Sequence, residues 1–427
     1  MMEKTKANIM KKKYYKVSFK LSSPLILGSG FSAETDKDIL KDAKGIPFIP
    51  ASSIAGICQS AMQNLWAKRG LDETRREEKK KKYFGDVSND GKENIQSHSK
   101  ICFYDATIFK GTPYISVRDG VGLDEYKVAR KSAKFDMEVL EPGVTFVTYF
   151  EQNFYSEGEE DIIKDLATIW KNAQIYLGAK TMRGYGAIQE VHVWKKEFDF
   201  SKKDSVTEWL SFDMYADWNE DEEEITGSYV EGGLLLELKQ VGGISIRKYT
   251  EENEESVPDS EQLTIWNNGK EIPVIPGSSW AGAFLHRMKE LDPQENYEAL
   301  FGDCKSKSVI RFSESQIMGA KEKVLTRNAI DRFSGGAMDK ALFTEKTYYG
   351  GSTTLKINFS EKKALTENAA RTLAACITDL HYGFLSIGGL TAVGRGLFCI
   401  EKVNGQKVAD DKLFQSVLEI LEKEIVQ

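Results

Sequence analysis

GAKTMRGYG at residues 178–186 returns in altered form as GGLTAVGRG at residues 388–396. The two segments share three glycines and one threonine, at Gly178/Gly388, Thr181/Thr391, Gly184/Gly394 and Gly186/Gly396. Each segment stands directly before a stretch that reads as a β-strand. A Gly-rich turn that recurs in the same local setting indicates that one structural unit occurs twice in the chain.

Three further motifs occur in the same order ahead of each Gly-rich segment. The pairs are IPFIPASSIAG (46–56) with IPVIPGSSWAG (272–282), YFGD (83–86) with LFGD (300–303), and RDGVGLDE (118–125) with RNAIDRF (327–333). The copies are 226 residues apart at Pro50/Pro276 and 209 apart at Arg118/Arg327. The chain is therefore predicted to be a tandem duplication.

The chain length of 427 residues suffices for two such domains. We place the boundary near residue 212, which gives a first domain of residues 1–212 and a second of residues 213–427. An acidic linker over about 213–228 forms the end of a link, 196–228, that we expect to be exposed.

The charge of the chain is unevenly distributed. A net charge of −7 by itself argues weakly against a nucleic-acid-binding protein. However, residues 212–227 hold seven acids and residues 251–261 hold six, with no lysine or arginine in either segment. The remainder of the chain is consequently net basic, which allows it to contact a polyanion.

Hydrophobic periodicity predicts the same order of elements in both halves. In the first half it predicts strands at 14–22, 100–109, 112–117, 144–152 and 187–194, and helices at 52–67 and 159–175. In the second half it predicts strands at 234–240, 308–317, 353–360 and 397–403, and helices at 278–290, 363–380 and 411–425. The underlying order β-α-β-β-α-β is typical of an α+β fold of the ferredoxin-like kind.

The P-x-S-S motifs place a proline turn and two hydroxyls before a predicted helix. Ser52 and Ser53 in one copy, and Ser278 and Ser279 in the other, are N-cap candidates. A helix N-terminus with hydroxyls and free backbone N–H groups also suits a phosphate. We keep both interpretations, and the recurrence of the motif with a Gly-rich loop favours the phosphate of an RNA backbone.

The Gly-rich loops have the composition of an anion-binding turn. Glycines let the backbone approach a ligand and expose its N–H groups, and cationic side chains add positive charge. The candidate RNA-binding residues are Gly178, Lys180, Thr181, Arg183, Gly184 and Gly186 in the first loop, and Gly388, Thr391, Gly394, Arg395 and Gly396 in the second. The alternative interpretation is a tight connection between a helix and a strand.

A long excursion precedes a predicted strand in each half, over about 118–143 and 327–352. Positive charge there is interleaved with bulky side chains, as suits a hairpin that lies along RNA and wedges between bases. The candidate RNA-contacting residues are Arg118, Lys127, Arg130, Lys131 and Lys134 in the first excursion, and Arg327, Arg332 and Phe333 in the second. In the alternative interpretation, the apolar residues pack on their own domain.

The loop GSGFSAETDKDILKDAKGIP after the first strand contains Asp36, Asp38 and Asp42. A carboxylate close to a scissile phosphate can hold a divalent ion that helps to activate an RNA 2′-hydroxyl. The alternative interpretation is a solvated acidic loop.

Together these motifs resemble the RAMP superfamily, in particular the backbone subunit of type III CRISPR effectors, here as a fusion of two domains. The resemblance spans nearly the whole chain. It implies RRM-like domains, each with a thumb hairpin, that hold a guide RNA (crRNA) by its backbone and kink the guide–target duplex. It further implies neighbouring backbone, large and small subunits as partners, and cleavage of target RNA with Mg²⁺ or Mn²⁺.

The resemblance also implies a catalytic aspartate. In that family the catalytic Asp stands six residues before a second Asp, and Asp36 with Asp42 has this spacing, so Asp36 is the predicted catalytic and metal-binding residue. Asp38 is the less favoured alternative. In the second copy the corresponding position is Asp259 or Glu261, depending on where the gap is placed.

Other classes of protein find little support. The five cysteines show no C-x-x-C spacing and the four histidines are scattered, which argues against disulfides, a zinc site and a histidine-based nuclease. No apolar run approaches 18 residues and the lysine-rich N-terminus lacks a signal-like apolar stretch, so we expect a cytoplasmic protein without membrane contact. Two further hypotheses stay open: an inert crRNA-holding scaffold and a guide-processing endoribonuclease.

Overall fold

The computed structural model describes residues 9–30, 35–87, 96–123, 129–218, 233–248, 258–267, 270–303, 305–359 and 365–425. Lys127 and most of the predicted acidic linker lie outside these residues, and only the backbone of Arg130 is described.

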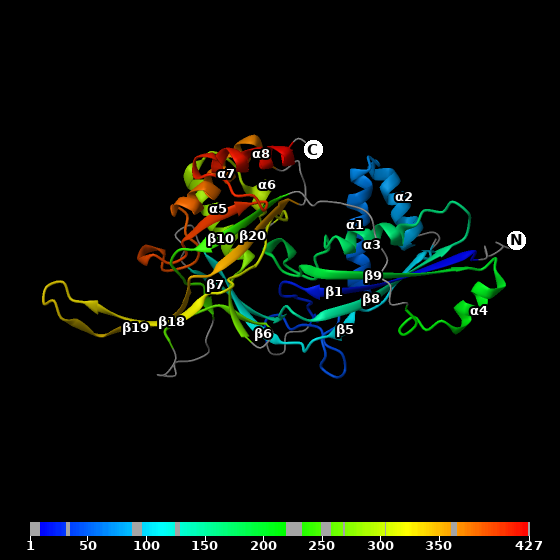
Figure 1. Cartoon of the computed structure of the whole chain (residues 1–427), viewed down its shortest axis with the longest axis horizontal. Helices are drawn as coiled ribbons and strands as arrows, with labels where there is room; N and C mark the ends of the chain where they lie inside the picture. Colours follow the sequence, from blue (N-terminus) through cyan, green and yellow to red (C-terminus); the bar gives the residue numbers. More distant parts are fainter. Residues whose placement is uncertain are drawn as a thin grey trace.

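Domain 1 is built on an antiparallel sheet in the order β4-β8-β1-β9, with β5 also paired to β8. The strands are β1 (Lys11–Leu21), β4 (Ile101–Phe103), β5 (Thr107–Lys110), β8 (Thr145–Phe154) and β9 (Ile188–Asp199). The helices α1 (Ala51–Lys68) and α3 (Ile162–Lys171) lie on one side of this sheet (Figure 1). The second, third, first and fourth strands of the β-α-β-β-α-β order are therefore neighbours, which is the ferredoxin-like arrangement.

The core of domain 1 follows from two periodicities. Along β1, Val17, Phe19 and Leu21 alternate inward and are buried. On α1 the buried residues recur every four positions, at Ile54, Cys58, Met62 and Trp66. These side chains form one hydrophobic cluster with the buried face of α3.

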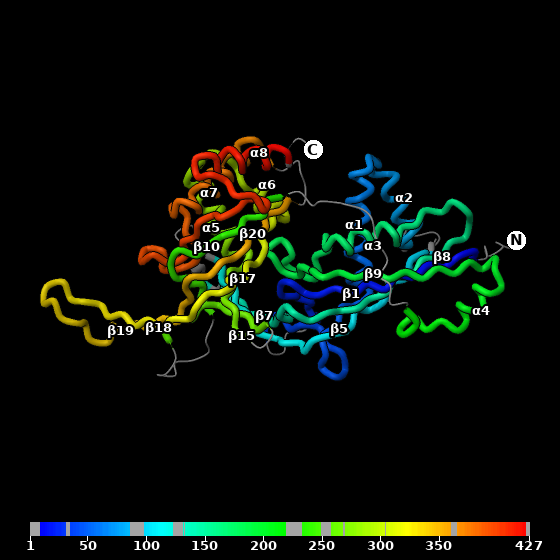
Figure 2. Tube along the Cα trace, in the orientation of Figure 1, coloured from blue at the N-terminus to red at the C-terminus, as the bar shows by residue number. Residues whose placement is uncertain are grey.

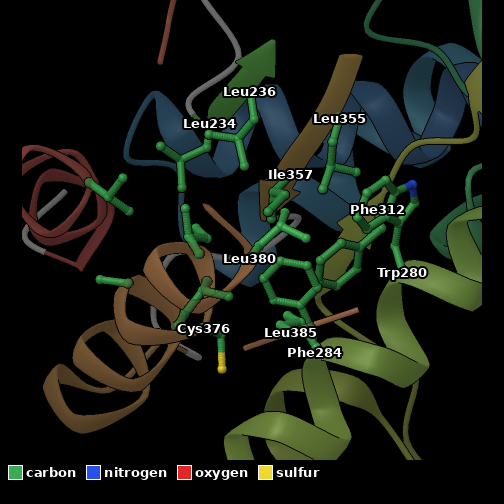
Figure 3. Close-up of a cluster of buried hydrophobic side chains, with 14 of the residues drawn as sticks. Leu234, Leu236, Trp280, Phe284, Phe312, Leu355, Ile357, Cys376, Leu380 and Leu385 are labelled. Carbon is green, nitrogen blue, oxygen red and sulfur yellow. The ribbon is translucent and has the colours of Figure 1, made fainter. Parts of the chain in front are cut away.

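Domain 2 repeats this sheet in the order β16-β20-β10-β21. Its elements are β10 (Leu234–Gln240), α5 (Gly277–Leu291), β16 (Ile310–Phe312), β20 (Ser352–Phe359), α7 (Glu367–Tyr382), β21 (Phe398–Val403) and a terminal α8 (Leu413–Ile425). Figure 3 shows Trp280 and Phe284 of α5 meeting Phe312, Ile357 and Leu380 in its core. The predicted duplication of one α+β fold is therefore present in the structure.

The remaining elements are short or lie outside the two repeated sheets. The helices are α2 (Glu73–Phe84), α4 (Lys203–Ser211) and α6 (Glu298–Phe301), and the strands are β2 (Asp86–Val87), β3 (Gln96–Ser97), β11 (Gly243–Ile244), β12 (Arg247–Lys248), β13 (Ser260–Gln262), β14 (Thr264–Asn267), β15 (Lys270–Ile275) and β17 (Ser315–Gln316). The F-G-D motif marks helix ends, because Gly85 and Gly302 follow α2 and α6 with positive φ.

The link expected to be exposed over 196–228 is exposed or half-buried in its described part, apart from Phe198, yet it packs against domain 1. Strand β9 continues to Asp199, and α4 folds back so that Nε1 of Trp209 donates to the hydroxyl of Tyr14 at 3.1 Å. The rings of Tyr149 and Trp218 lie 6.0 Å apart. Half-buried aromatic side chains therefore hold the segment up to Trp218 against domain 1, and the boundary near 212 stays a prediction.

Each domain carries a long hairpin, β6 (Ile115–Leu123) with β7 (Ala129–Leu140), and β18 (Lys321–Ile330) with β19 (Ala337–Tyr349). The first reaches from domain 1 beneath domain 2, and the second projects away from the body of the molecule (Figure 1). The traces in Figure 2 show the same difference between the two copies.

A buried ion cluster joins the domains. Arg118 on β6 is 4% exposed, and its guanidinium donates to Glu141 at 2.8 Å and to Glu314 of domain 2 at 2.6 Å. Burial alone would lower the pKa of Arg118, but the charges of Glu314 and Glu141 raise it well above its ordinary value. The prediction that Arg118 contacts RNA from an exposed hairpin is therefore corrected: its side chain is enclosed between the domains.

We expect Arg118→Met to loosen the domain interface. It leaves the carboxyl groups of Glu141 and Glu314 buried together without a cation, and breaking a buried pair in this way costs about 3–5 kcal/mol. Small-angle X-ray scattering should show a larger radius of gyration, and amide hydrogen exchange should accelerate in β16. The exposed pair Arg371–Glu367 on α7 provides the control, since Arg371→Met should change neither measurement. An unchanged scattering curve for Arg118→Met would contradict the role of this cluster.

Candidate nucleic-acid interface

The acidic loop of domain 1 is fastened to the hairpin by two reciprocal hydrogen bonds. The N–H of Asp36 donates to Oδ1 of Asp136 on β7 at 2.8 Å, and the N–H of Asp136 donates to Oδ2 of Asp36 at 3.1 Å. The structure thus brings a second carboxylate beside the predicted catalytic aspartate. Sequence reasoning missed Asp136 because it lies 100 residues away, on a strand of the hairpin.

The other two acids of this loop act in local turns. Oδ1 of Asp38 accepts from the N–H and the hydroxyl of Thr35, both at 2.9 Å. Oδ1 of Asp42 accepts from the N–H groups of Lys44 and Ile46. Side chains used in this way stabilise the loop backbone, whereas the carboxylate of Asp36 accepts from the hairpin and not from its own loop.

Domain 2 has the corresponding contact at Asp259. Its Oδ2 accepts the N–H of Thr344 on β19 at 2.6 Å, as Asp36 accepts the N–H of Asp136 on β7. Glu261 instead lies within β13, where it pairs with Lys248 across the strand. Asp259 is therefore the structural counterpart of Asp36, but Thr344 stands where domain 1 has a second carboxylate.

These donors fit a divalent cation only in combination with other ligands. Among the described residues, no group of three or more His, Cys, Asp or Glu side chains is placed to hold a metal ion. Asp36 and Asp136 supply two carboxylates, and Mg²⁺ is commonly bound by one or two carboxylates together with substrate phosphate and water. Two carboxylates of domain 1 would therefore hold such an ion only together with ligands from outside the described residues.

Glycines of the two Gly-rich loops are needed for close packing within the chain, a role that was not predicted. Gly178 turns with φ +74° where a side chain would strike the carbonyl of Ile26, and Gly186 turns with φ +72° against the carbonyl of Leu177. Gly388 and Gly396 occupy the same kind of place in domain 2. The prediction that these glycines open the backbone to a ligand is therefore corrected, and they allow close approach within the fold.

The threonines of the two loops have a local role that was not predicted. Thr181 and Thr391 each begin a short 3-10 turn, Thr181–Arg183 and Thr391–Val393. The carbonyl oxygen of Thr181 accepts the N–H of Gly184 at 3.2 Å, and that of Thr391 accepts the N–H of Gly394 at 3.1 Å. These backbone carbonyls therefore close the turns. An RNA contact of their half-buried side chains stays a prediction.

Lys180 is the cation that the first Gly-rich loop brings to strand β7. It precedes the turn Thr181–Arg183 in the left-handed conformation, and its Nζ lies 3.9 Å from the ring centroid of Phe135 and 3.1 Å from Sδ of Met137. Phe135 and Met137 flank Asp136 on β7. Burial, with Arg183 and Lys37 nearby, lowers the pKa of Lys180 to about 8.

The first Gly-rich loop also meets the start of helix α5. A Cβ built on Gly277, the first residue of α5, would lie 2.5 Å from the carbonyl oxygen of Arg183. The N-caps are Pro50 and Pro276, so the prediction that the serines are N-caps is wrong. Ser278 and Ser279 lie in the first turn of α5, next to the loop of the preceding domain, and Ser52 and Ser53 lie in the first turn of α1.

The remaining predicted RNA-contacting residues differ in how far their side chains are exposed. Arg395 is 8% exposed and bonds to Glu345, which also accepts from Arg327 at 2.7 Å, so the predicted RNA contact of Arg395 is corrected to an internal ion pair. Arg183, Lys131, Lys134, Arg332 and Phe333 are exposed. Phe333 is held at the tip of the second hairpin, where its N–H donates to Oδ1 of Asp331 at 2.7 Å.

Comparison with known proteins gives one family. The profile of the RAMP superfamily matches residues 18–189 and again residues 225–399. No curated protein matches the chain. Among the described helices, none is long and apolar enough to cross a membrane.

We expect RNA affinity to fall as the pH rises from about 7 to about 9. Lys180 has a pKa lowered to about 8, so its charge is lost in this window, whereas an ordinary lysine keeps its charge. Loss of one phosphate contact should reduce the slope of log affinity against log salt by about one. Lys180→Arg should abolish the pH dependence because arginine stays charged. Lys131→Arg is the matched control, and an identical pH profile for wild type and Lys180→Arg would contradict the assignment.

Proposed function

Because the chain belongs to the RAMP superfamily, we propose that it is a backbone subunit of a type III CRISPR effector that binds crRNA and cleaves paired target RNA in domain 1. The observation that supports the catalytic part best is the reciprocal pair Asp36–Asp136, with Lys180 beside the same strand. The partners we propose are crRNA, target RNA, and neighbouring backbone, large and small subunits. A cytoplasmic location is part of the same proposal.

The RNA backbone would bind where the two domains meet. The loop of domain 1 contributes the exposed Arg183 and the half-buried Lys180, and domain 2 contributes the first turn of α5 with Ser278 and Ser279. Cationic side chains and a helix N-terminus both favour a phosphate, and the serine hydroxyls can donate to its oxygens. Such a contact recognises the RNA backbone and not the bases. A subunit that accepts any guide sequence requires recognition of this kind.

Cleavage would take place at the loop that carries Asp36. A divalent cation held there, Mg²⁺ or Mn²⁺, would favour ionisation of an RNA 2′-hydroxyl and stabilise the charge that develops on the phosphate. Asp36 and Asp136 would hold the ion, and their mutual backbone bonds fix both carboxyl groups relative to the hairpin. Lys180 contacts Phe135 and Met137, whose side chains alternate with that of Asp136 along β7, so its positive charge lies on the other face of this strand.

The same geometry favours domain 2 as a weaker nuclease or an inert holder of RNA. Asp259 repeats the contact of Asp36, yet Thr344 provides no carboxylate. The alternative function, a scaffold without cleavage in either domain, would keep both hairpins and the phosphate contacts. A guide-processing nuclease is less well supported, since His98, His192, His286 and His381 lie outside the acidic and Gly-rich loops.

We expect Asp36→Asn to remove one metal-dependent cut in target RNA. The assay uses the assembled complex with labelled target, in Mg²⁺ or in EDTA. Loss of the Asp36 carboxylate should slow this cut at least about 100-fold, and the affinity for RNA should be unchanged. Asp136→Asn should slow the same cut, and Asp42→Asn, in the same loop, is the matched control with normal cleavage.

Each other result has a definite meaning. Normal cutting by Asp36→Asn would refute the catalytic assignment, and cleavage of guide instead of target would favour the processing nuclease. If wild type binds target tightly and leaves it whole, the scaffold function holds. A cut lost only in Asp259→Asn would show that domain 2 is active without a second carboxylate.

We expect Phe333→Ala to weaken binding of a guide–target duplex without affecting folding. Phe333 is fully exposed at the hairpin tip, so its removal costs no packing. A ring that stacks on a base contributes about 1–3 kcal/mol, which corresponds to a loss of affinity of roughly 5- to 150-fold. Val241→Ala, an exposed apolar residue of domain 2 outside the hairpin, is the control. Equal affinities for the two variants would contradict a contact between the tip and RNA.

A further inference from the structure

The sheet of domain 1 has one face that helices α1 and α3 do not cover. These helices pack on the face of Val17, Phe19 and Leu21 (Figure 1), so the alternate residues of β1 lie on the opposite, open face. The segment that ends at Trp218 covers one part of the open face, where its ring lies 6.0 Å from that of Tyr149. This face therefore already receives flat aromatic rings from the chain itself.

Beside that covered part, a lysine lies between two aromatic rings. Lys16 is the cross-strand partner of Tyr149 on β8 and of Trp194 on β9. Its Nζ is 4.9 Å from the ring centroid of Trp194 and 5.7 Å from that of Phe109 on β5. The ring of His192, two residues before Trp194 on β9, lies 6.1 Å from the Trp194 ring. Phe109 is 62% exposed and His192 is exposed, and we call these two residues with Lys16 and Trp194 the aromatic strip.

The charge of Lys16 is not balanced by an acid in the described part of the chain. On the same face of β1, Lys12 pairs with Glu151 and Lys20 pairs with Glu190. For Lys16, burial lowers the pKa and no nearby carboxylate raises it. Ring faces attract an ammonium group but carry no net charge. An anion is therefore still favoured at Lys16.

Domain 2 shows that the fold does not require these rings. Strand pairing places Lys402 and Asn404 of β21 where domain 1 has His192 and Trp194. Lys402 forms an ion pair with Glu237 at 2.8 Å. The repeated sheet therefore forms without aromatic side chains at these positions, so the packing of the sheet does not account for the aromatic strip.

The aromatic strip leads along β1 to a cleft between the domains. Lys20 lies on the same face of β1 as Lys16, and it lines this cleft together with its cross-strand partner Gln189. The cleft has a volume of about 640 Å³, and domain 2 contributes Thr354 and Lys356 of β20 to its wall. This volume suits a group as large as a nucleotide. A ligand chain that crosses the strip along β1 would therefore continue into the cleft.

We propose that the aromatic strip binds an unpaired single strand of nucleic acid, with bases stacked on Phe109 and His192 and a phosphate at Lys16. Surfaces that bind single strands combine positive charge with aromatic side chains, and they tolerate any sequence because every base has a π-face. The paired and stacked bases of a duplex are not available for such contacts. The proposal goes beyond the proposed function, because it requires neither a paired target nor cleavage.

The test measures the affinity of the full chain for short fluorescent oligouridine and oligothymidine, which distinguish RNA from DNA as the strand. All proteins carry Arg183→Glu, which weakens the phosphate contact where the domains meet. Phe109→Ala should reduce the affinity at least about fivefold, as loss of one stacked base predicts, and leave its salt dependence unchanged. Lys16→Gln should reduce the slope of log affinity against log salt by about 0.7, the value for one phosphate of a single strand.

Matched changes elsewhere serve as controls. Phe414→Ala on α8 removes a partly exposed ring and Lys289→Gln on α5 removes an exposed cation, and neither should change binding. Phe109→Trp keeps a ring and should keep the affinity. Circular dichroism checks folding. Mass spectrometry after photo-cross-linking should find the oligonucleotide on the peptides that contain Phe109 and His192.

Three results would overturn the proposal. The first is an unchanged affinity and salt slope in both Phe109→Ala and Lys16→Gln. The second is cross-linking only at peptides outside the aromatic strip. The third is a base-paired duplex that binds as tightly as the single strand, since charge alone would then explain the binding. None of these measurements uses crRNA or cutting, so they fail or succeed independently of the proposed function.

Discussion

The arrangement of the two domains depends on one guanidinium, that of Arg118, enclosed between Glu141 and Glu314. Removing these charges from water is costly, and the cost is offset only when donors and acceptors meet in good geometry. A buried ion cluster of this type therefore tolerates few relative positions of the domains. Hydrophobic contact alone would be less selective, because apolar surfaces can slide over one another. The charge cluster fixes where the loop of domain 1 meets the start of α5, and with it the proposed phosphate site.

Duplication explains the common framework, and divergence at a few positions explains the difference between the copies. Both domains keep the sheet order, the Gly-rich turn and an aspartate that accepts an N–H from the hairpin. The copies differ at Asp136 and Thr344, which changes the number of carboxylates, and at Ala51 and Gly277, which changes the space at the helix start. None of these differences disturbs a core, so each can alter a site without altering the fold.

The sequence predicted what depends on periodicity and repetition. The alternation in β1, the four-residue spacing of buried side chains on α1 and the repeated motifs suffice for the two ferredoxin-like sheets. It did not predict contacts between distant segments. Asp136 carries no local signal, and Arg118 looks like any cation on a hairpin until Glu314 is seen beside it. The N-cap prediction failed because Pro50, whose ring fixes φ, itself takes the extended N-cap position. The helix therefore begins before the serines, which lie within its first turn.

A composite site has a consequence for how such a chain works. If a phosphate is held by the loop of one domain and the helix start of the next, then neither domain alone contains a whole site. Two domains in one chain make one complete site, from Lys180 and Arg183 with the first turn of α5. Two half sites are left at the ends, the start of α1 and the 388–396 loop. If a neighbouring domain completes either half site, the affinity for RNA and the affinity for that domain are thermodynamically linked, and each increases the other.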